Sequence, residues 1–268
     1  MSNLAVRIAT AFVGIPLLLV IDALGGPIFA AVAGIASGVA AYEAFAIVSA
    51  AGYRPAALPG ILTAAVIAPA PLLAAQPQSL WVGWLLLLMV ISAAYYLLPS
   101  VYGRNMAGWG LTLAVAAYIG LCLGHLSLLR SWSDGDRWVG LLLVITWAYD
   151  SGAFFAGRTW GRRPFMAHVS PKKTMEGVAG GLALAAAAAL VGVPAVHLGV
   201  AEALVLGVAG AAAAQLGDLI VSMLKREAGV KDSGHLIPGH GGLLDRIDSL
   251  LLVSVTVYYT AGLFGHGS

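Results

Sequence analysis

Long apolar runs follow one another along almost the whole chain, and they constrain its fold more than any other feature. Of the 268 residues, 60% are hydrophobic and only 10% are charged, whereas a soluble domain carries about 25% charged residues. The mean hydropathy is +0.91. A water-soluble globule is therefore excluded, and we expect an all-α, polytopic integral membrane protein.

The positions of Gly, Pro and charged residues divide the apolar sequence into about nine expected transmembrane helices. The expected spans are 7–24, 27–50, 58–75, 80–98, 108–129, 138–157, 175–195, 197–224 and 246–264. The loops are too short for a separate soluble domain, so we expect residues 1–268 to form a single transmembrane domain. The first run is interpreted as an uncleaved helix, because Asp22 stands where a signal peptide would be cleaved.

Basic residues predict the orientation, since Lys and Arg collect on the cytoplasmic side of a membrane. With nine spans and a cytoplasmic N-terminus, 12 of the 14 basic residues lie inside. These are Arg7, Arg54, Arg104, Arg158, Arg162, Arg163, Lys172, Lys173, Lys225, Arg226, Lys231 and Arg246. Arg130 and Arg137 fall outside, in a loop where Asp134 and Asp136 balance them.

Charge also separates two halves of the chain. Four acidic residues precede position 150, whereas eight acidic and nine basic residues lie from Asp150 onward. We interpret 1–137 as a helical scaffold half and 138–268 as the half that carries the catalytic motifs. In the first half, Gly34-x-x-x-Gly38 allows close helix approach, either within the chain or in a dimer.

The strongest local signal starts near the end of the span 197–224. Asp218, Ser222 and Lys225 stand at i, i+4 and i+7, so they share one face of a helix, with Arg226 adjacent. The segment 229–242 is too rich in Gly and Pro for a regular helix and is expected to leave backbone N–H groups free. Such backbone can cradle phosphate oxygens.

This segment ends in Asp245-x-x-Asp248, which places two carboxylates on one face of a starting helix, beside Arg246. Together with Asp218 they make three carboxylates at the membrane surface, which suit a hard cation such as Mg²⁺ in a polyphosphate site. The alternative interpretation is that Asp245 and Asp232 only pair with Arg246 and Lys231, and that the basic residues set topology.

A second group of polar residues spans 150–181. Asp150 lies deep in an apolar span and is expected to face a polar cavity. A turn at 170–174 precedes a helix whose free N–H groups favour anions, with Lys172 and Lys173 alongside. Both lysines are equally open to interpretation as solvated topology charges.

Several function classes lack support. The net charge of +2 does not suggest nucleic-acid binding, and the single Cys122 allows neither a disulfide nor a Cys-based metal site. The sequence contains no G-x-S-x-G elbow, Walker A motif or dinucleotide fingerprint. His235 and His240 flank the Gly/Pro segment and could contact phosphate, but no zinc-type spacing is present.

The run SMLKREAGVKDSGHLIPGHGGLLDRID, from Ser222 to Asp248, closely resembles the signature of the phosphatidate cytidylyltransferases, also called CDP-diacylglycerol synthases. The upstream segments DSGAFFAGR and SPKKTMEG resemble further blocks of the same family. Together they cover about the last 120 residues. The sequence departs from the family pattern at Phe154, where many relatives carry Tyr.

This resemblance implies the reaction CTP + phosphatidate → CDP-diacylglycerol + pyrophosphate in phospholipid biosynthesis. It implies an Mg²⁺-dependent nucleotidyltransferase with K⁺ as a second cation, on the cytoplasmic face of a bacterial inner membrane. CTP, phosphatidate and the lipid bilayer are the implied partners. A homodimer is expected from the resemblance and from Gly34-x-x-x-Gly38.

The resemblance also suggests roles for individual residues. The implied metal ligands are Asp218 and Asp245, with Asp248 as a third or supporting carboxylate. The implied catalytic set adds Lys225 and Arg226, which neutralise the triphosphate and pyrophosphate. The implied substrate-binding residues are Asp150, Lys172, Lys173, Ser222, Lys231 and Arg246.

Two other functions stay open. An ion-coupled transporter would also use intramembrane carboxylates and broken helices, but it predicts inverted repeats that the sequence does not show. A nearer alternative changes the acceptor to a polyprenyl or diether phosphate, or makes the enzyme a CTP-dependent lipid kinase.

Overall fold

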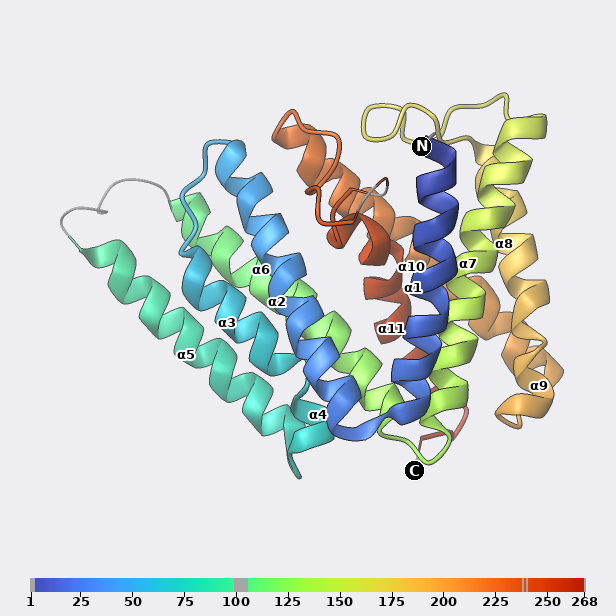
Figure 1. Cartoon of the computed structure of the whole chain (residues 1–268), viewed down its shortest axis with the longest axis horizontal. Coiled ribbons are helices and arrows are strands. Elements are labelled where there is room, and N and C mark those ends of the chain that lie inside the picture. Colours follow the sequence, from blue (N-terminus) through green and yellow to red (C-terminus); the bar gives the residue numbers. More distant parts are fainter. Residues whose placement is uncertain (1–2, 99–105, 238, 240, 268) are drawn as a thin grey trace. The chain divides into compact units, whose positions relative to one another are not determined.

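The computed structural model describes residues 3–98, 106–237, 239 and 241–267, with side chains from Phe12 onward. Arg104 and His240 lie outside the described residues. The described part contains helices and no strand, in agreement with the all-α prediction. The helices are α1 (Asn3–Leu24), α2 (Gly26–Ala50), α3 (Ala57–Ile67), α4 (Ala70–Leu73), α5 (Pro77–Leu97), α6 (Met106–Arg130), α7 (Gly135–Trp160), α8 (Met175–Ala189), α9 (Gly192–Ala195), α10 (Val200–Glu227) and α11 (Leu244–Leu263) (Figure 1).

Six helical segments of the described chain are long and apolar enough to cross a membrane. They are α2, α5, α6, α7, α10 and the stretch Met175–Ala195, which contains α8 and α9. These six candidate spans support the expected polytopic membrane protein. The other three expected spans also fall on helices, but the count of nine and the cytoplasmic N-terminus stay predictions.

Proline breaks one expected span. The run 58–75 is divided into α3 and α4 at Ala68 and Pro69. Proline has no N–H to continue the helical ladder, and its ring disfavours a continuous helix through the preceding turn. The chain restarts with a bond from Leu72 N to Pro69 O of 3.0 Å.

The chain divides into two compact units. The first unit comprises residues 1–131 and 224–246, and the second comprises 132–223 and 247–268. Residues 224–246, which charge alone grouped with the second half, therefore pack with the first. The expectation of a single domain stays a prediction.

In the first unit, α2 packs against α3 and α6, and α3 also packs against α5 (Figure 1). A Cβ added at Gly34 would lie 3.0 Å from the carbonyl oxygen of Ala65, and one at Gly38 would lie 3.4 Å from the Ala65 Cβ. The Gly34-x-x-x-Gly38 motif therefore serves helix packing within the chain.

Arg130 at the end of α6 has a partner in α1. Its Nε lies 3.1 Å from Asp22 Oδ1, and its Nε and Nη2 donate to the Asp22 carbonyl oxygen at 2.9 and 2.8 Å. The sequence assigned the balancing charge to the neighbouring loop. The structure assigns it to Asp22, whose carboxylate is buried and requires a cation.

In the second unit, α7 and α8 pack closely because glycines face one another. A Cβ at Gly180 would lie 2.2 Å from the Ala156 Cβ, and one at Gly152 would lie 2.6 Å from the carbonyl oxygen of Gly180. The connecting segment 161–174 is drawn in yellow at the top of Figure 1. Thr174 caps α8, and its Oγ1 accepts the N–H of Gly177 at 3.1 Å.

Candidate active site

A cavity of about 520 Å³ lies in the second unit. Its walls come from α7, the segment 161–174, α8 and α10. The lining residues are Tyr149, Asp150, Ala153, Phe154, Gly157, Arg158, Lys172, Lys173, Thr174, Gly177, Val178, Gln215 and Asp218. Three cations and two carboxylates therefore share one cavity, and four of these five charged residues are sequence-predicted site residues.

The residues from α7 follow one stripe of that helix. Pairs at 149–150, 153–154 and 157–158 recur every four residues, which is close to one helical turn. Along the helix axis, Tyr149 and Arg158 are separated by about 14 Å at 1.5 Å per residue. Arg158 therefore lies at one end of this stripe, and Tyr149 and Asp150 lie at the other.

Lys172 and Lys173 are positioned by the backbone of the connecting segment. Phe165 N donates to Lys173 O at 2.8 Å, and Met175 N donates to Arg163 O at 2.9 Å. These bonds, with the Thr174 cap, hold both lysines at the start of α8. Lys172 is exposed and Lys173 is half-buried.

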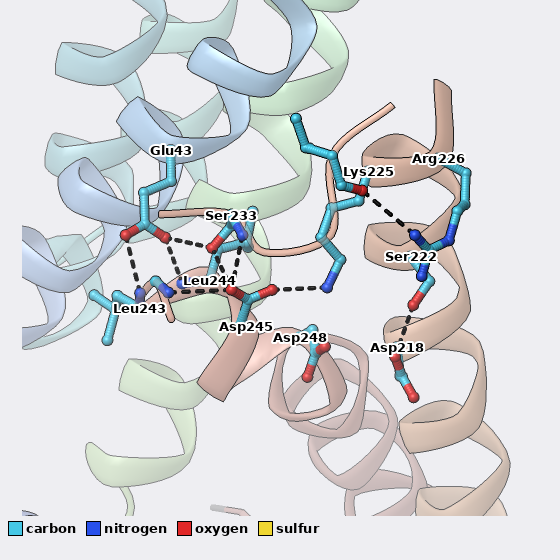
Figure 2. A network of polar contacts seen from close by, with 12 residues as sticks. Glu43, Asp218, Ser222, Lys225, Arg226, Ser233, Leu243, Leu244, Asp245 and Asp248 are labelled. Carbon is cyan, nitrogen blue, oxygen red and sulfur yellow. Dashed lines mark hydrogen bonds and ion pairs between the residues drawn. The ribbon is translucent and has the colours of Figure 1, made fainter. Parts of the chain in front are cut away.

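Lys173 forms an ion pair with Asp218 across the cavity. Its Nζ lies 2.5 Å from Asp218 Oδ2, and the two side chains are 19% and 31% exposed. The other oxygen, Oδ1, accepts the hydroxyl of Ser222 at 3.0 Å (Figure 2). The charges of Lys173 and Asp218 therefore neutralise each other, and both side chains stay accessible from the cavity.

Tyr149 and Gln215 form a neutral hydrogen-bonded pair in the cavity wall, and neither residue was among the predicted site residues. The Tyr149 hydroxyl donates to Gln215 Oε1, and the two residues are 2% and 6% exposed. Gln215 Nε2 is buried and has no hydrogen-bond partner in the described structure. One feature of the sequence could have pointed to Gln215, because it is a polar amide within an apolar run, one helical turn before Asp218.

Asp245 is the centre of a separate polar cluster in the first unit (Figure 2). Its Oδ1 lies 2.7 Å from Lys225 Nζ, and its Oδ2 accepts Ser233 N at 2.7 Å, Ser233 Oγ at 3.0 Å and Gly242 N at 3.1 Å. Burial raises the pKa of this carboxyl, but the hydrogen bonds from Lys225 and the backbone outweigh burial and hold the pKa below its usual value.

Glu43 of α2 completes this cluster and was also missed. It accepts Ser233 Oγ at 2.8 Å, Leu243 N at 3.0 Å and Leu244 N at 2.8 Å (Figure 2). The side chain therefore caps the start of α11 from another helix. A single acidic residue within an apolar span indicates a functional site, so the sequence alone could have identified Glu43 as a candidate.

The Gly/Pro segment is thus held by carboxylates. The expectation that its backbone N–H groups are free is wrong for Ser233 and Gly242, which donate to Asp245. The physical reason is burial, because a buried N–H group without a partner is costly and the nearby carboxylates satisfy it.

The remaining predicted residues have these positions. Arg226, Lys231, Arg246 and His235 are exposed. Arg226 Nη1 lies 3.5 Å from the carbonyl oxygen of Val230. Asp248 is half-buried on α11, and its Oδ1 accepts the N–H of Ser249 at 2.7 Å.

The described residues contain no group of three or more His, Cys, Asp or Glu side chains that could hold a metal ion. Magnesium does not require such a group, because it commonly takes one or two carboxylates and completes its shell with water and substrate phosphates. Asp150 and Asp218 line the same cavity. This donor set fits Mg²⁺ held together with a phosphorylated substrate.

Comparison with known proteins places the chain in a family. Residues 5–264 match the model of the cytidylyltransferase family. The chain belongs to this family. Because the match covers nearly the whole chain, membership extends to both halves, including the first half, which has no recognisable motif.

Three bacterial relatives carry the name phosphatidate cytidylyltransferase. The protein of Bacillus subtilis is 41% identical over 162 residues, which is 58% of each chain. That of Haemophilus influenzae is 40% identical over 190 residues, 63% of this chain and 62% of the relative. That of Staphylococcus saprophyticus is 35% identical over 204 residues, 73% of this chain and 76% of the relative. The chain thus matches less than two thirds of the length of the first two.

Proposed function

We propose that this chain is a phosphatidate cytidylyltransferase, which transfers CMP from CTP to phosphatidate and releases pyrophosphate. Family membership and the names of the relatives support this assignment. The single observation that carries it in the structure is the Lys173–Asp218 pair, 2.5 Å apart in a cavity with two further cations. A polyanion would engage the lysine, and a metal ion would engage the released carboxylate.

In the proposed reaction, a phosphate oxygen of the lipid attacks the α-phosphorus of CTP. A new P–O–P bond forms, the bond from the α-phosphorus to the β-phosphate oxygen breaks, and pyrophosphate leaves with the electron pair. Both reactants are polyanions, so charge neutralisation and in-line positioning make up most of the catalysis. Lys172, Lys173 and Arg158 supply the cations of the cavity.

No general base is required for this attack. A phosphomonoester has a second pKa of about 6, so the lipid phosphate is already largely a dianion near neutral pH. The lysines need only to bring the two anions together. We propose that Lys172 and Lys173 bind the lipid phosphate or the nucleotide, and that Ser222 holds the orientation of Asp218.

We propose that Asp218 holds Mg²⁺, with Asp150 as a second oxygen ligand or as a partner of a cavity lysine. When bound, Mg²⁺ neutralises charge on the triphosphate and the leaving group. The K⁺ implied by the resemblance would use similar carboxylate oxygens. The proposed ligand roles of Asp245 and Asp248 stay predictions, since Asp245 already accepts Lys225 and two backbone N–H groups.

The wider proposals rest on the resemblance. Lys225, Arg226, Lys231 and Arg246 are proposed to neutralise the triphosphate and pyrophosphate. The proposed location is a bacterial inner membrane, with about nine spans, a cytoplasmic N-terminus and the site facing the cytoplasm. A homodimer is proposed from the resemblance alone, because Gly34 and Gly38 pack against α3 of the same chain.

Pyrophosphate release by detergent-purified protein tests the function. With CTP, Mg²⁺ and phosphatidate, we expect lipid-dependent release that Asp218→Asn reduces at least about 100-fold, as for other charged groups acting on a transferring phosphoryl group. Asp136→Asn, an exposed acid in the first turn of α7, is the matched control and should retain full activity. A folded wild-type protein that releases no pyrophosphate with this lipid would overturn the proposal.

A further inference from the structure

The buried amide of Gln215 lines the cavity, and the proposed reaction does not use its chemistry. Its Nε2 has no hydrogen-bond partner in the described structure, although the residue is only 6% exposed. An unsatisfied buried donor is costly in a native protein. Because Gln215 lines the cavity, a bound molecule can supply the missing acceptor.

The orientation of this amide is determined by its neighbour. The Tyr149 hydroxyl donates to Gln215 Oε1, which leaves the two N–H bonds of Nε2 as the groups without an acceptor. Tyr149 is itself held against α8, where a Cβ at Gly181 would lie 2.6 Å from its ring. The Nε2 donor of Gln215 is therefore held in place by the packed side chain of Tyr149.

The position of the amide favours a neutral acceptor. Asp150 adjoins Tyr149 on α7, and Asp218, one turn after Gln215 on α10, is neutralised by Lys173 at 2.5 Å, so the net charge near the amide does not favour a further anion. Arg158 lies nine residues further along α7 than Tyr149, toward the other end of the cavity. An uncharged amide donor beside two acids suits a carbonyl oxygen better than a phosphate.

The distance between phosphate and ester carbonyl in a diacyl lipid phosphate fits the spacing of Asp218 and Gln215 on α10. Gln215 precedes Asp218 by three residues, which is about 4.5 Å along the helix axis. In a diacyl lipid phosphate, the ester carbonyls are neutral acceptors separated from the phosphate by a few bonds of glycerol. Apolar walls from Ala153, Phe154 and Val178 line the same cavity and suit the start of an acyl chain.

We propose that Gln215 Nε2 donates a hydrogen bond to an acyl ester carbonyl of the lipid substrate, and that this bond makes the site selective for ester-linked over ether-linked lipid phosphates. The inference rests on the proposed function and specifies its lipid substrate class. Gln215 touches the substrate, whereas Tyr149 acts through Gln215 as a positioning residue.

The test compares 1,2-dioleoyl phosphatidate with its 1,2-di-O-oleyl ether analogue, each with saturating CTP and Mg²⁺ in mixed micelles. The wild-type protein should prefer the diester by about tenfold in kcat/KM, because the ether leaves the buried amide unpaired. Gln215→Met, which keeps the length of the side chain, should lower activity on the diester about tenfold and bring the ratio near one. Activity on the diether should change little.

Two further variants separate recognition from folding. Tyr149→Phe removes the bond that orients the amide and should lower the diester-to-diether ratio about threefold, an effect that a purely structural defect would not produce. Gln78→Met, the same substitution at an exposed position of α5, is the matched control and should leave the ratio unchanged.

The outcomes distinguish this inference from the proposed function. Wild-type protein inactive on both lipids would overturn the proposed function itself. Active wild-type protein that uses the diester and the diether equally well would overturn the ester contact alone. So would a Gln215→Met variant whose activity falls by the same factor on both lipids. A Gln215→Met variant whose KM for CTP rises, or whose preference for CTP over UTP falls, would instead assign the amide to the nucleotide and would also overturn it.

Discussion

Glu43 and Asp245 together accept four backbone N–H groups at the Gly-rich segment and the start of α11. These are the N–H groups of Ser233, Gly242, Leu243 and Leu244. Both carboxylates are buried, at 5% and 9% exposure. At the scale of single residues, they order a segment that has no regular secondary structure, because each bond satisfies a group that would otherwise be buried unpaired.

Removal of the Glu43 carboxylate should loosen this segment. Glu43→Ala leaves Leu243 N and Leu244 N without their acceptor, whereas the Ser233 hydroxyl keeps Asp245 Oδ2, and we expect a loss of about 1–3 kcal/mol in stability. Thermal unfolding in detergent measures the loss. Glu227→Ala, an exposed acid at the end of α10, should leave the melting temperature within error of the wild type. An equally stable Glu43→Ala protein would contradict the capping role.

The contributions of Lys225 and Asp245 to the stability of the protein should be strongly coupled. Both side chains are at most 10% exposed, so Lys225→Met leaves a buried carboxylate without its cation and should cost about 3 kcal/mol. The double variant Lys225→Met/Asp245→Asn removes both charges and should recover most of this stability. A thermal double-mutant cycle measures the coupling, and purely additive losses would show that the pair does not act as a unit.

At the scale of elements, the cavity depends on how closely α7 and α8 approach. Gly152, Gly177, Gly180 and Gly181 all lie at that contact, where an added Cβ would come within 3.0 Å of atoms of the opposite helix. Since α7 carries Tyr149, Asp150 and Arg158 and the segment just before α8 carries Lys173, this contact sets the width of the site. Small residues allow helices to pack in a membrane, where hydrophobic burial drives association little.

A single methyl group at this contact should therefore separate the helices. Gly180→Ala places a Cβ 2.2 Å from that of Ala156, and we expect a cost of about 1–3 kcal/mol together with weaker binding of substrate. Gly140→Ala adds the same methyl group to α7 with no atom within 4 Å, so stability should be unchanged or slightly higher. Thermal unfolding and KM for phosphatidate measure both effects, and equal behaviour of the two variants would contradict the packing argument.

At the scale of the whole molecule, the distribution of Lys and Arg predicts which loops face the cytoplasm. The segment 161–174 carries several basic residues, whereas Asp134 precedes α7 and Asp136 lies in its first turn. These two loops flank α7, which is one of the six candidate spans. They are therefore expected on opposite sides of the membrane.

Cysteine labelling in intact cells tests this orientation. In a Cys122→Ser background, which removes the one native cysteine, Ala167→Cys should react only with a membrane-permeant maleimide. Ser133→Cys should also react with an impermeant one. Both positions are exposed in the structure. The same labelling pattern at both sites would show that α7 does not cross the membrane, and the reverse pattern would invert the topology.

The sequence by itself determined the all-helical membrane class, because long apolar runs with few charges satisfy their backbone polar groups only as helices within a bilayer. Local patterns also predicted particular elements. The apolar run 197–224 predicted a helix on which Asp218, Ser222 and Lys225 share one face, and α10 contains all three. The turn before α8 and the start of a helix at Asp245 were predicted for the same reason, since caps, prolines and glycines act over a few neighbouring residues.

Only the tertiary structure decided which side chains meet. Glu43 binds Leu244, which lies 201 positions further along the chain, and Tyr149 binds Gln215, which lies 66 positions further. No local pattern encodes such pairs, because they follow from how helices pack and not from the spacing within one helix. The choice of Lys173 for Asp218 and of Lys225 for Asp245 has the same origin: several cations were available in sequence, and burial and distance selected the partner.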